Sequence, residues 1–252
     1  MRNIRIIPQI LIIDEEIYKT KNFDNPKYIG DPINTIKLFN ELEADELVIV
    51  DIGKTKKKEA INFDFIREIV SEAFMPVTYG GGIKSTDDAK HILSCGVEKI
   101  LINHSFMKNP KIIYDIQSEI GSQSTSVSID VIKNQKNEFL IYDYVNKKET
   151  DKKLIEIINV ISKFGAGEVI INSVDRDGMM NGLECLILEQ IKNEVNIPII
   201  IAGGANGIEN FIEAQKLGAS GIAAGSMFVY HGNTNGILIN YPAQEELNIR
   251  LQ

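Results

Sequence analysis

A short apolar strand that runs into glycines occurs twice in this chain, 122 residues apart. Residues 76–83 have the sequence PVTYGGGI, and residues 198–205 have the sequence PIIIAGGA. Because glycine has no Cβ, the backbone N–H groups of such a loop can approach a bound anion closely. One copy alone would also fit a tight strand-to-helix turn. Two copies in register favour a doubled anion-binding loop.

The repeat extends beyond the glycines and has a length of about half the chain. Residues 46–49 (ELVI) align with 168–171 (EVII) at the same offset, and Phe106 aligns with Phe228. We therefore expect one domain spanning residues 1–252, built from half-barrels of about 1–122 and 123–252.

Apolar runs alternate with segments of helical period along the whole chain, which predicts βα units and a parallel sheet. The strands are expected at 4–13, 46–51, 76–79, 99–103, 125–130, 168–172, 198–202 and 221–224. The helices are expected at 33–43, 58–73, 85–95, 109–119, 152–164, 185–194 and 207–217. Two similar four-strand halves favour a closed (β/α)8 TIM barrel over an open doubly wound sheet.

The loops after the third, fourth, seventh and eighth strands form the predicted binding face, because ligands of such barrels sit at the C-terminal ends of the strands. The residues in these loops suited to hold phosphate are Gly81, Gly82, Asn103, His104, Gly203, Gly204, Gly225 and Ser226. For His104 an ordinary loop histidine is the competing interpretation. The predicted ligand carries two phosphates, one for each half.

Three other segments depart from a minimal barrel. Residues 14–31 form a long polar excursion after the first strand, which we expect to act as a lid. Residues 133–148 are expected to form a small hairpin. Residues 231–236 are rich in turn formers, and no eighth helix is predicted after them.

Composition excludes several functional classes. The net charge of −8 disfavours a nucleic-acid binder. No continuous apolar stretch approaches the length of a membrane span, and the N-terminus lacks the pattern of a secretory signal. Cys95 and Cys185 are too few for a disulfide framework or a structural zinc site, so we expect a cytoplasmic protein without a metal or cofactor.

The order of these elements and several specific motifs make the chain resemble the cyclase subunit of imidazole glycerol phosphate synthase, from Arg5 to about Phe228. The motifs are RIIP at 5–8, NF at 22–23, GDP at 30–32, DEL at 45–47, GGGI at 80–83, IN at 102–103, GSQ at 121–123, GAGE at 165–168 and DRDG at 175–178. The resemblance implies a bisphosphorylated ribulosyl carboxamide ribotide bound across the barrel mouth. It also implies a separate glutaminase subunit on the N-terminal face, which delivers ammonia through the barrel.

The resemblance also assigns candidate roles to charged and polar residues. The ammonia gate of the family corresponds to Arg5, Glu46, Lys99 and Glu168. Other residues on the substrate face are Lys19, Asp51, Ser173 and Asp177. The alternative for the four gate charges is simple pairing that closes the barrel bottom, since buried ions need partners.

The first strand departs from the family pattern at its catalytic position. The family's chemistry resembles acid–base catalysis by two aspartates, at the ends of the first and fifth strands. The second is present as Asp130, whereas the first is replaced by Leu11. Losing one positioned acid–base group typically costs about 100- to 10,000-fold in rate. The sequence thus predicts an impaired cyclase.

Further departures lie on the same face and at the C-terminus. Thr20 replaces a glycine of the family, His104 a small hydroxyl residue and Asn172 a threonine. The ending at 236–242 (GILINYP) resembles a paralogous branch associated with glycosyl amidation in surface-polysaccharide gene clusters. In that branch the barrel and its glutaminase supply ammonia to a separate sugar amidotransferase, which is therefore a candidate partner here.

These observations leave three hypotheses. The first is a barrel that conducts ammonia for amidation of a surface sugar. The second is the genuine cyclase of histidine biosynthesis, making imidazole glycerol phosphate and AICAR, with Asp130 alone or helped by Asp14 or Asp177. The third is a non-catalytic scaffold that activates the glutaminase.

Overall fold

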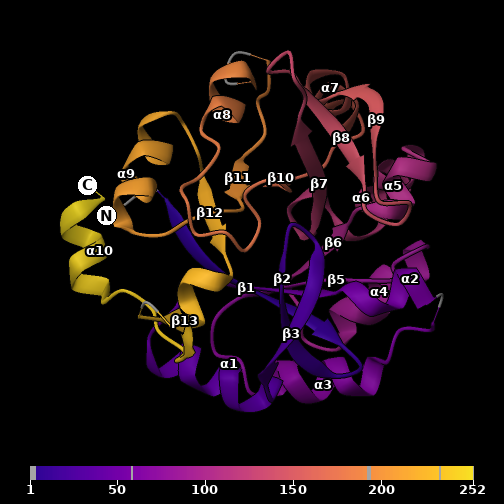
Figure 1. Ribbon diagram of the computed structural model, residues 1–252. Helices are drawn as coiled ribbons and strands as arrows, with labels where there is room; N and C mark the ends of the chain where they lie inside the picture. The colour runs from indigo at the N-terminus through magenta and orange to yellow at the C-terminus, as the bar shows by residue number, and fades with distance from the viewer. Residues whose placement is uncertain (1–3, 58, 192–193, 233, 252) are drawn as a thin grey trace.

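Eight parallel strands close into a barrel in the computed structural model of the chain, which describes residues 4–57, 59–191, 194–232 and 234–251 (Figure 1). The barrel strands are β1 (Arg5–Ile13), β4 (Leu47–Asp51), β5 (Val77–Gly80), β6 (Lys99–Ile102), β7 (Thr125–Lys133), β10 (Glu168–Ser173), β11 (Ile199–Ala202) and β12 (Gly221–Ala224). They pair in this order, and β7 pairs with β10 to complete the ring. The predicted (β/α)8 barrel is confirmed.

Helices surround the barrel in Figure 1. They are α1 (Pro32–Glu41), α2 (Ile52–Lys57), α3 (Phe63–Ser71), α4 (Thr86–Ser94), α5 (His104–Lys108), α6 (Lys111–Ile120), α7 (Leu154–Lys163), α8 (Leu186–Ile191), α9 (Ile208–Lys216) and α10 (Gln244–Arg250). Residue 58 of the predicted helix 58–73 and residues 192–193 of the predicted helix 185–194 lie outside the described residues. Local capping begins several helices; for example, Asp31 Oδ1 accepts a hydrogen bond of 2.8 Å from Asn34 N at the start of α1.

The expectation that no eighth helix follows the last barrel strand was wrong, because α10 follows β12 near the C-terminus. Leu247 and Leu251 are its buried anchors. The segment before it is also fixed, since the Tyr241 hydroxyl donates to the Ile6 carbonyl oxygen over 2.9 Å. Two apolar side chains are too few to give a recognisable helical period in the sequence. The helix is therefore stabilised mainly by packing against the rest of the protein.

Alternate residues of the barrel strands face the helices and the barrel interior. On β1, Ile6, Ile10 and Ile12 belong to the large core between strands and helices, whereas Ile7 belongs to a separate inner cluster. The inner cluster consists of Ile7, Val48, Leu101, Ile170, Ile200, Ala202 and Ala223. It forms an apolar layer between the two ends of the barrel.

Two hairpins extend the barrel strands beyond the mouth. The segment after β1, predicted as a long polar loop, forms β2 (Glu16–Lys21) and β3 (Asp24–Gly30), with β2 antiparallel to β1. Burial of Ile17 and Ile29 explains why this segment forms a regular hairpin. The predicted second hairpin is present as β8 (Phe139–Asp143) and β9 (Lys148–Lys153), which continue from β7.

The two hairpins touch each other. The rings of Phe23 and Tyr142 pack edge to face with centroids 6.2 Å apart, and Lys147 Nζ lies 3.1 Å from Asp24 Oδ1. A third, small hairpin of β13 (Tyr230–His231) and β14 (Gly236–Ile237) occupies the turn-rich C-terminal segment. Short 3-10 helices, η1 (Ser122–Ser124) and η2 (Ser226–Phe228), complete the elements. Within the described ranges, no helix is both long and apolar enough to cross a membrane.

Candidate functional site

Four charged side chains meet in a ring at the N-terminal end of the barrel. Arg5 donates to Glu46 Oε2 over 2.7 Å and to Glu168 Oε2 over 2.9 Å. Lys99 Nζ donates to Glu46 Oε1 over 2.9 Å and to Glu168 Oε1 over 3.1 Å. Each carboxylate therefore binds both cations. The structure brings all four predicted gate residues together, while their role stays a prediction.

Hydroxyl groups support the two carboxylates of the ring. Thr78 Oγ1 donates to Glu46 Oε1 over 3.2 Å, and Ser126 Oγ donates to Glu168 Oε1 over 2.8 Å. Burial alone would raise the pKa of Glu168, but Lys99 and Arg5 outweigh it and hold that pKa below its ordinary value. The ring thus sets two basic side chains against two carboxyl side chains, each bonded to both of the others.

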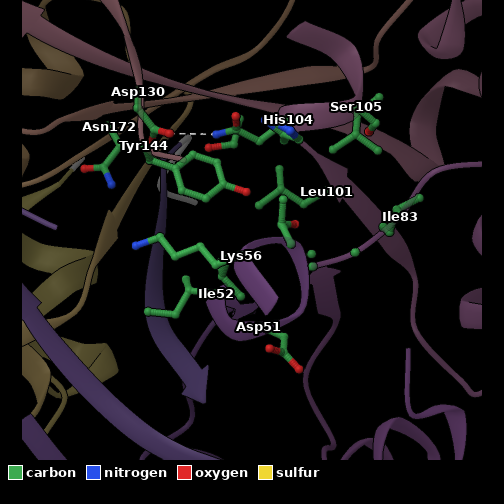
Figure 2. A pocket seen from close by; sticks show the side chains of 18 of the residues that line it. Asp51, Ile52, Lys56, Ile83, Leu101, His104, Ser105, Asp130, Tyr144 and Asn172 are labelled. Carbon is green, nitrogen blue, oxygen red and sulfur yellow. Dashed lines mark hydrogen bonds between the residues drawn. The ribbon is translucent and has the colours of Figure 1, made fainter. Parts of the chain in front are cut away.

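The opposite, C-terminal end of the barrel opens into a cavity of about 380 Å³. It is lined by the ends of β1, β4, β5, β6, β7 and β10 and by residues of α2 and α5. Figure 2 shows Asp130, Asn172 and Tyr144 on one side of this cavity and Asp51 on another. A second cavity of about 30 Å³ adjoins Gly203, Gly204, Gly225 and Ser226. Gln9, Leu11, Thr20, Asn172 and Asp177 line both cavities, so the two are neighbouring halves of one mouth.

The two glycine loops have equivalent geometry in the two halves. A methyl group on Gly81 would lie 2.6 Å from the carbonyl oxygen of Asp51, and one on Gly203 would lie 2.6 Å from that of Ser173. Both glycines have positive φ, of 137° and 93°. Asp51 and Ser173 are themselves 122 residues apart. The sequence repeat therefore extends to the packing of each glycine loop on the C-terminal end of the neighbouring barrel strand, β4 or β10. No side chain fits at these contacts.

Asp130 is buried at the mouth, and the amide group of Asn103 favours its ionised form by a hydrogen bond. Asn103 Nδ2 donates to its Oδ2 over 2.8 Å. Burial raises the pKa of Asp130 to about 7, against the opposing effect of the Asn103 hydrogen bond. A carboxyl group with this pKa is partly protonated near neutral pH, so it can donate or accept a proton.

Leu11 occupies the mouth where a second acid–base group was expected in the family pattern. It is half-buried and lines both cavities, as does Gln9 two residues earlier on β1. Its side chain therefore points into the barrel mouth and adds an apolar surface there. No proton can be exchanged at this position.

Lys19 and Asp177 lie in the half of the mouth near β12. Lys19 Nζ donates to the Gln9 carbonyl oxygen, and a methyl group on Gly225 would overlap Lys19 Nζ. Burial lowers the pKa of Lys19 to about 8, which still leaves it mainly protonated at neutral pH. Asp177 Oδ2 accepts a hydrogen bond of 2.9 Å from Thr20 Oγ1, and burial raises the pKa of Asp177.

The remaining predicted substrate-face residues divide between the two cavities. Asp51 lines the larger cavity, where its Oδ1 accepts from the backbone N–H groups of Gly53 and Lys54 over 3.1 and 3.2 Å. Burial raises the pKa of Asp51. Ser173 lines neither cavity, and its contribution is the carbonyl oxygen against which Gly203 packs.

Sequence reasoning missed an aromatic and basic group in the larger cavity. Tyr144, just after β8, packs edge to face against His104 with ring centroids 6.1 Å apart, and Lys56 Nζ lies 5.9 Å from the Tyr144 ring centroid. Burial raises the pKa of Tyr144 to about 12 and lowers that of His104. The sequence predicted the hairpin but contains no signal that residue 144 reaches the mouth. In the described part of the chain, no cluster of three or more His, Cys, Asp or Glu side chains is suited to hold a metal ion.

Comparison with known proteins gives consistent family matches along almost the whole chain. The model of the family described as "Histidine biosynthesis protein" matches residues 5–235. A Leptospira borgpetersenii protein named "Putative imidazole glycerol phosphate synthase subunit HisF" is 43% identical over 242 residues, which cover 94% of each chain. A Pseudomonas aeruginosa protein named "Putative imidazole glycerol phosphate synthase subunit hisF2" is 38% identical over 246 residues, covering 97% of this chain and 98% of the relative.

A third relative has a name without a qualifier. "Imidazole glycerol phosphate synthase subunit HisF" of Endomicrobium trichonymphae is 35% identical over 230 residues, covering 91% of this chain and 88% of its own. The family match over residues 5–235 includes all eight barrel strands. The chain therefore belongs to the histidine biosynthesis protein family, as a member of the imidazole glycerol phosphate synthase cyclase-subunit family.

Proposed function

We propose that this protein is the barrel subunit of a glutamine amidotransferase complex, which passes ammonia from a separate glutaminase through the barrel for amidation of a surface sugar. The observation that carries the proposal is the combination of an intact charged ring with Leu11 at the mouth. The ring residues Arg5, Glu46, Lys99 and Glu168 are mutually bonded at the N-terminal end. At the other end, Asp130 is left without a second acid–base group at position 11.

The barrel interior suits transport of a small neutral molecule. Between the ring and the mouth lies the apolar inner cluster that includes Ile7, Leu101 and Ile170. Moving an unpaired ammonium ion through this layer would be costly, whereas neutral ammonia carries no such penalty. Ring opening, with Lys99 leaving one carboxylate, would admit ammonia alone.

The mouth suits a bisphosphorylated ligand but only part of the cyclase chemistry. Two glycine loops of matching geometry provide one phosphate site in each half, and Lys19 adds positive charge beside Gly225. Asp130, with its pKa of about 7, supplies one acid–base group. Reactions that need an acid and a base on opposite sides of the substrate lack the second group at Leu11. Ligand binding at the mouth would then regulate ammonia delivery to a sugar amidotransferase.

Nitrogen labelling in the reconstituted complex tests this proposal. The protein, a cognate glutaminase and a sugar amidotransferase receive glutamine labelled with 15N at the amide, together with excess unlabelled ammonium. Channelling predicts that the amidated sugar retains most of the 15N label. Dilution of the label to the isotopic composition of the bulk ammonium would contradict passage through the barrel.

Substitution in the ring separates a channel from a non-catalytic scaffold. Lys99→Met removes a cation that binds both carboxylates, whereas Lys90→Met removes an exposed lysine paired with Glu119. We expect Lys99→Met to lower 15N transfer several-fold with unchanged affinity for the glutaminase, and Lys90→Met to change neither. Normal transfer by a correctly folded Lys99→Met protein would favour the scaffold.

A genuine cyclase of histidine biosynthesis is the second candidate, favoured by one specific observation. Asp177 lines the same mouth as Asp130, and burial raises its pKa also. A second buried carboxyl group at the mouth could replace the aspartate lost at position 11. Rescue of a histidine auxotroph by this gene would support the second candidate over the first.

A further inference from the structure

Large apolar side chains are exposed on three segments that follow the barrel strands β1, β10 and β12. Each of these residues keeps between 44% and 55% of its surface exposed. The strands β10, β11, β12 and β1 are consecutive in the ring, so the three segments lie around one side of the mouth. We call this surface the apolar rim, and it consists of Tyr28 on β3, Met179 after β10, and Ile237 and Leu238 at the end of β14.

The segments that carry the apolar rim touch one another. Lys27 Nζ lies 5.2 Å from the centroid of the Tyr230 ring, which joins β3 to β13. Asn22 Nδ2 donates to the carbonyl oxygen of Val174 over 2.9 Å, which joins the β2–β3 turn to the loop after β10. A partner would therefore meet a preformed surface, and little ordering of these segments would be needed on binding.

The opposite side of the mouth has a different rim. Lys56, Lys84 and Lys108 line the larger cavity, and all three are exposed. The centres of protein interfaces are depleted in lysine and enriched in aromatic residues and methionine. The apolar rim is therefore the side of the mouth better suited to contact another protein.

The apolar rim also adjoins the proposed exit for ammonia. Met180, next to Met179, lines the smaller cavity, which shares Gln9 and Leu11 with the larger one. Amines are protonated in neutral water, so ammonia released into solvent would become ammonium, which has no lone pair with which to attack a sugar. An enzyme that uses this ammonia must cover the mouth.

We propose that the apolar rim is the docking surface for the sugar amidotransferase that consumes the ammonia. This inference rests on the proposed function and adds the face on which the accepting enzyme sits. The four apolar side chains form the centre of the contact, and the exposed lysines on the other side of the mouth stay at its edge. The glutaminase occupies the opposite end of the barrel, so the two partners do not compete.

Charged substitutions on the rim test the docking surface. The double variant Ile237→Glu and Leu238→Glu places two carboxylates there without removing a buried side chain. We expect the dissociation constant for immobilised sugar amidotransferase, measured by surface plasmon resonance, to rise at least about 10-fold. Affinity for the glutaminase should stay unchanged, and retention of 15N in the amidated sugar should fall. Ile249→Glu, at an exposed residue of α10, is the control and should bind the amidotransferase like the wild type.

Met179→Glu provides an independent test, because it lies on a different segment of the rim. We expect it also to weaken binding of the amidotransferase several-fold. Substitutions at exposed positions rarely change stability by much, so each variant should melt within about 2 °C of the wild type.

Failure of this inference differs from failure of the proposed function. Equal amidotransferase affinity of the wild type and all the rim variants, with the 15N label retained, would overturn the docking surface and leave ammonia delivery intact. If the wild type does not bind the amidotransferase and the label is diluted, the proposed function is wrong and the docking surface falls with it. Self-association of the wild type in analytical ultracentrifugation, abolished in the double variant, would assign the rim to a second copy of the chain and overturn the proposal.

Discussion

The proposed chemistry of the mouth depends most on one side chain, the carboxyl group of Asp130. Its pKa of about 7 lies well above the ordinary value of an aspartate, chiefly because the side chain is buried. Between pH 4 and pH 7 the folded protein therefore binds a proton that the unfolded chain releases. Stability contributed by this group falls as pH rises through that window.

Asp130→Asn should consequently stabilise the protein more at pH 8 than at pH 4. We expect the difference in free energy of unfolding between variant and wild type to grow by on the order of 2–4 kcal/mol across this range. Urea denaturation at several pH values measures it. Asp64→Asn, at a side chain with 94% exposure, is the surface control for the loss of one carboxylate. A flat difference for Asp130→Asn would mean that its pKa is not raised.

Backbone conformation at Gly204 provides a second prediction for a single residue. Its φ is 93°, and a methyl group there would overlap the carbonyl oxygen of Gly182. Gly204→Ala should lower the free energy of unfolding by at least about 2 kcal/mol and weaken binding of a bisphosphate. Gly30→Ala meets no atom within 4 Å and should change stability by less than about 1 kcal/mol. Equal effects of the two substitutions would argue against a strained anion loop.

Individual elements differ in how far the sequence determined them. The eight barrel strands were predictable because each is a short apolar run followed by turn formers. The helix α2 was missed because its sequence IGKTKK has no apolar period, and α5 because it has only five residues. In the mouth, the glycine loops could be placed from their repeat. Tyr144 could not, since a hairpin alone brings it there.

The loop before β5 presents an exposed apolar side chain at the N-terminal face of the barrel. Phe74, three residues before β5, is 89% exposed, the highest value among the described large apolar side chains. Residues that precede a barrel strand lie at its N-terminal face, where the proposed glutaminase binds. Exposed aromatic residues of this kind commonly anchor protein partners.

Phe74→Ala should therefore weaken binding of the glutaminase by about 10- to 100-fold. Surface plasmon resonance with the immobilised glutaminase measures the dissociation constant. Tyr114→Ala removes an aromatic side chain that is 52% exposed on α6 and serves as the matched control. If both variants bind as tightly as the wild type, Phe74 lies outside the interface.

The whole molecule combines a symmetric backbone with asymmetric chemistry. The glycine loops pack on Asp51 and Ser173 in the same way, yet the cavities beside them measure about 380 and 30 Å³. A sequence repeat predicts the shared backbone, since equivalent glycines adopt equivalent turns. It does not predict cavity size, because this depends on side chains from strands far apart in the chain.

The central claim is that this barrel delivers ammonia but lacks the complete cyclase pair, and Leu11 tests it most directly. The measurement is the rate of imidazole glycerol phosphate formation from the ribotide and glutamine, for wild type and Leu11→Asp, each assembled with the glutaminase. We predict glutamine hydrolysis without appreciable product for the wild type, and a gain of at least about 100-fold in product formation for Leu11→Asp. Robust product formation by the wild type, unchanged in Leu11→Asp, would contradict the account.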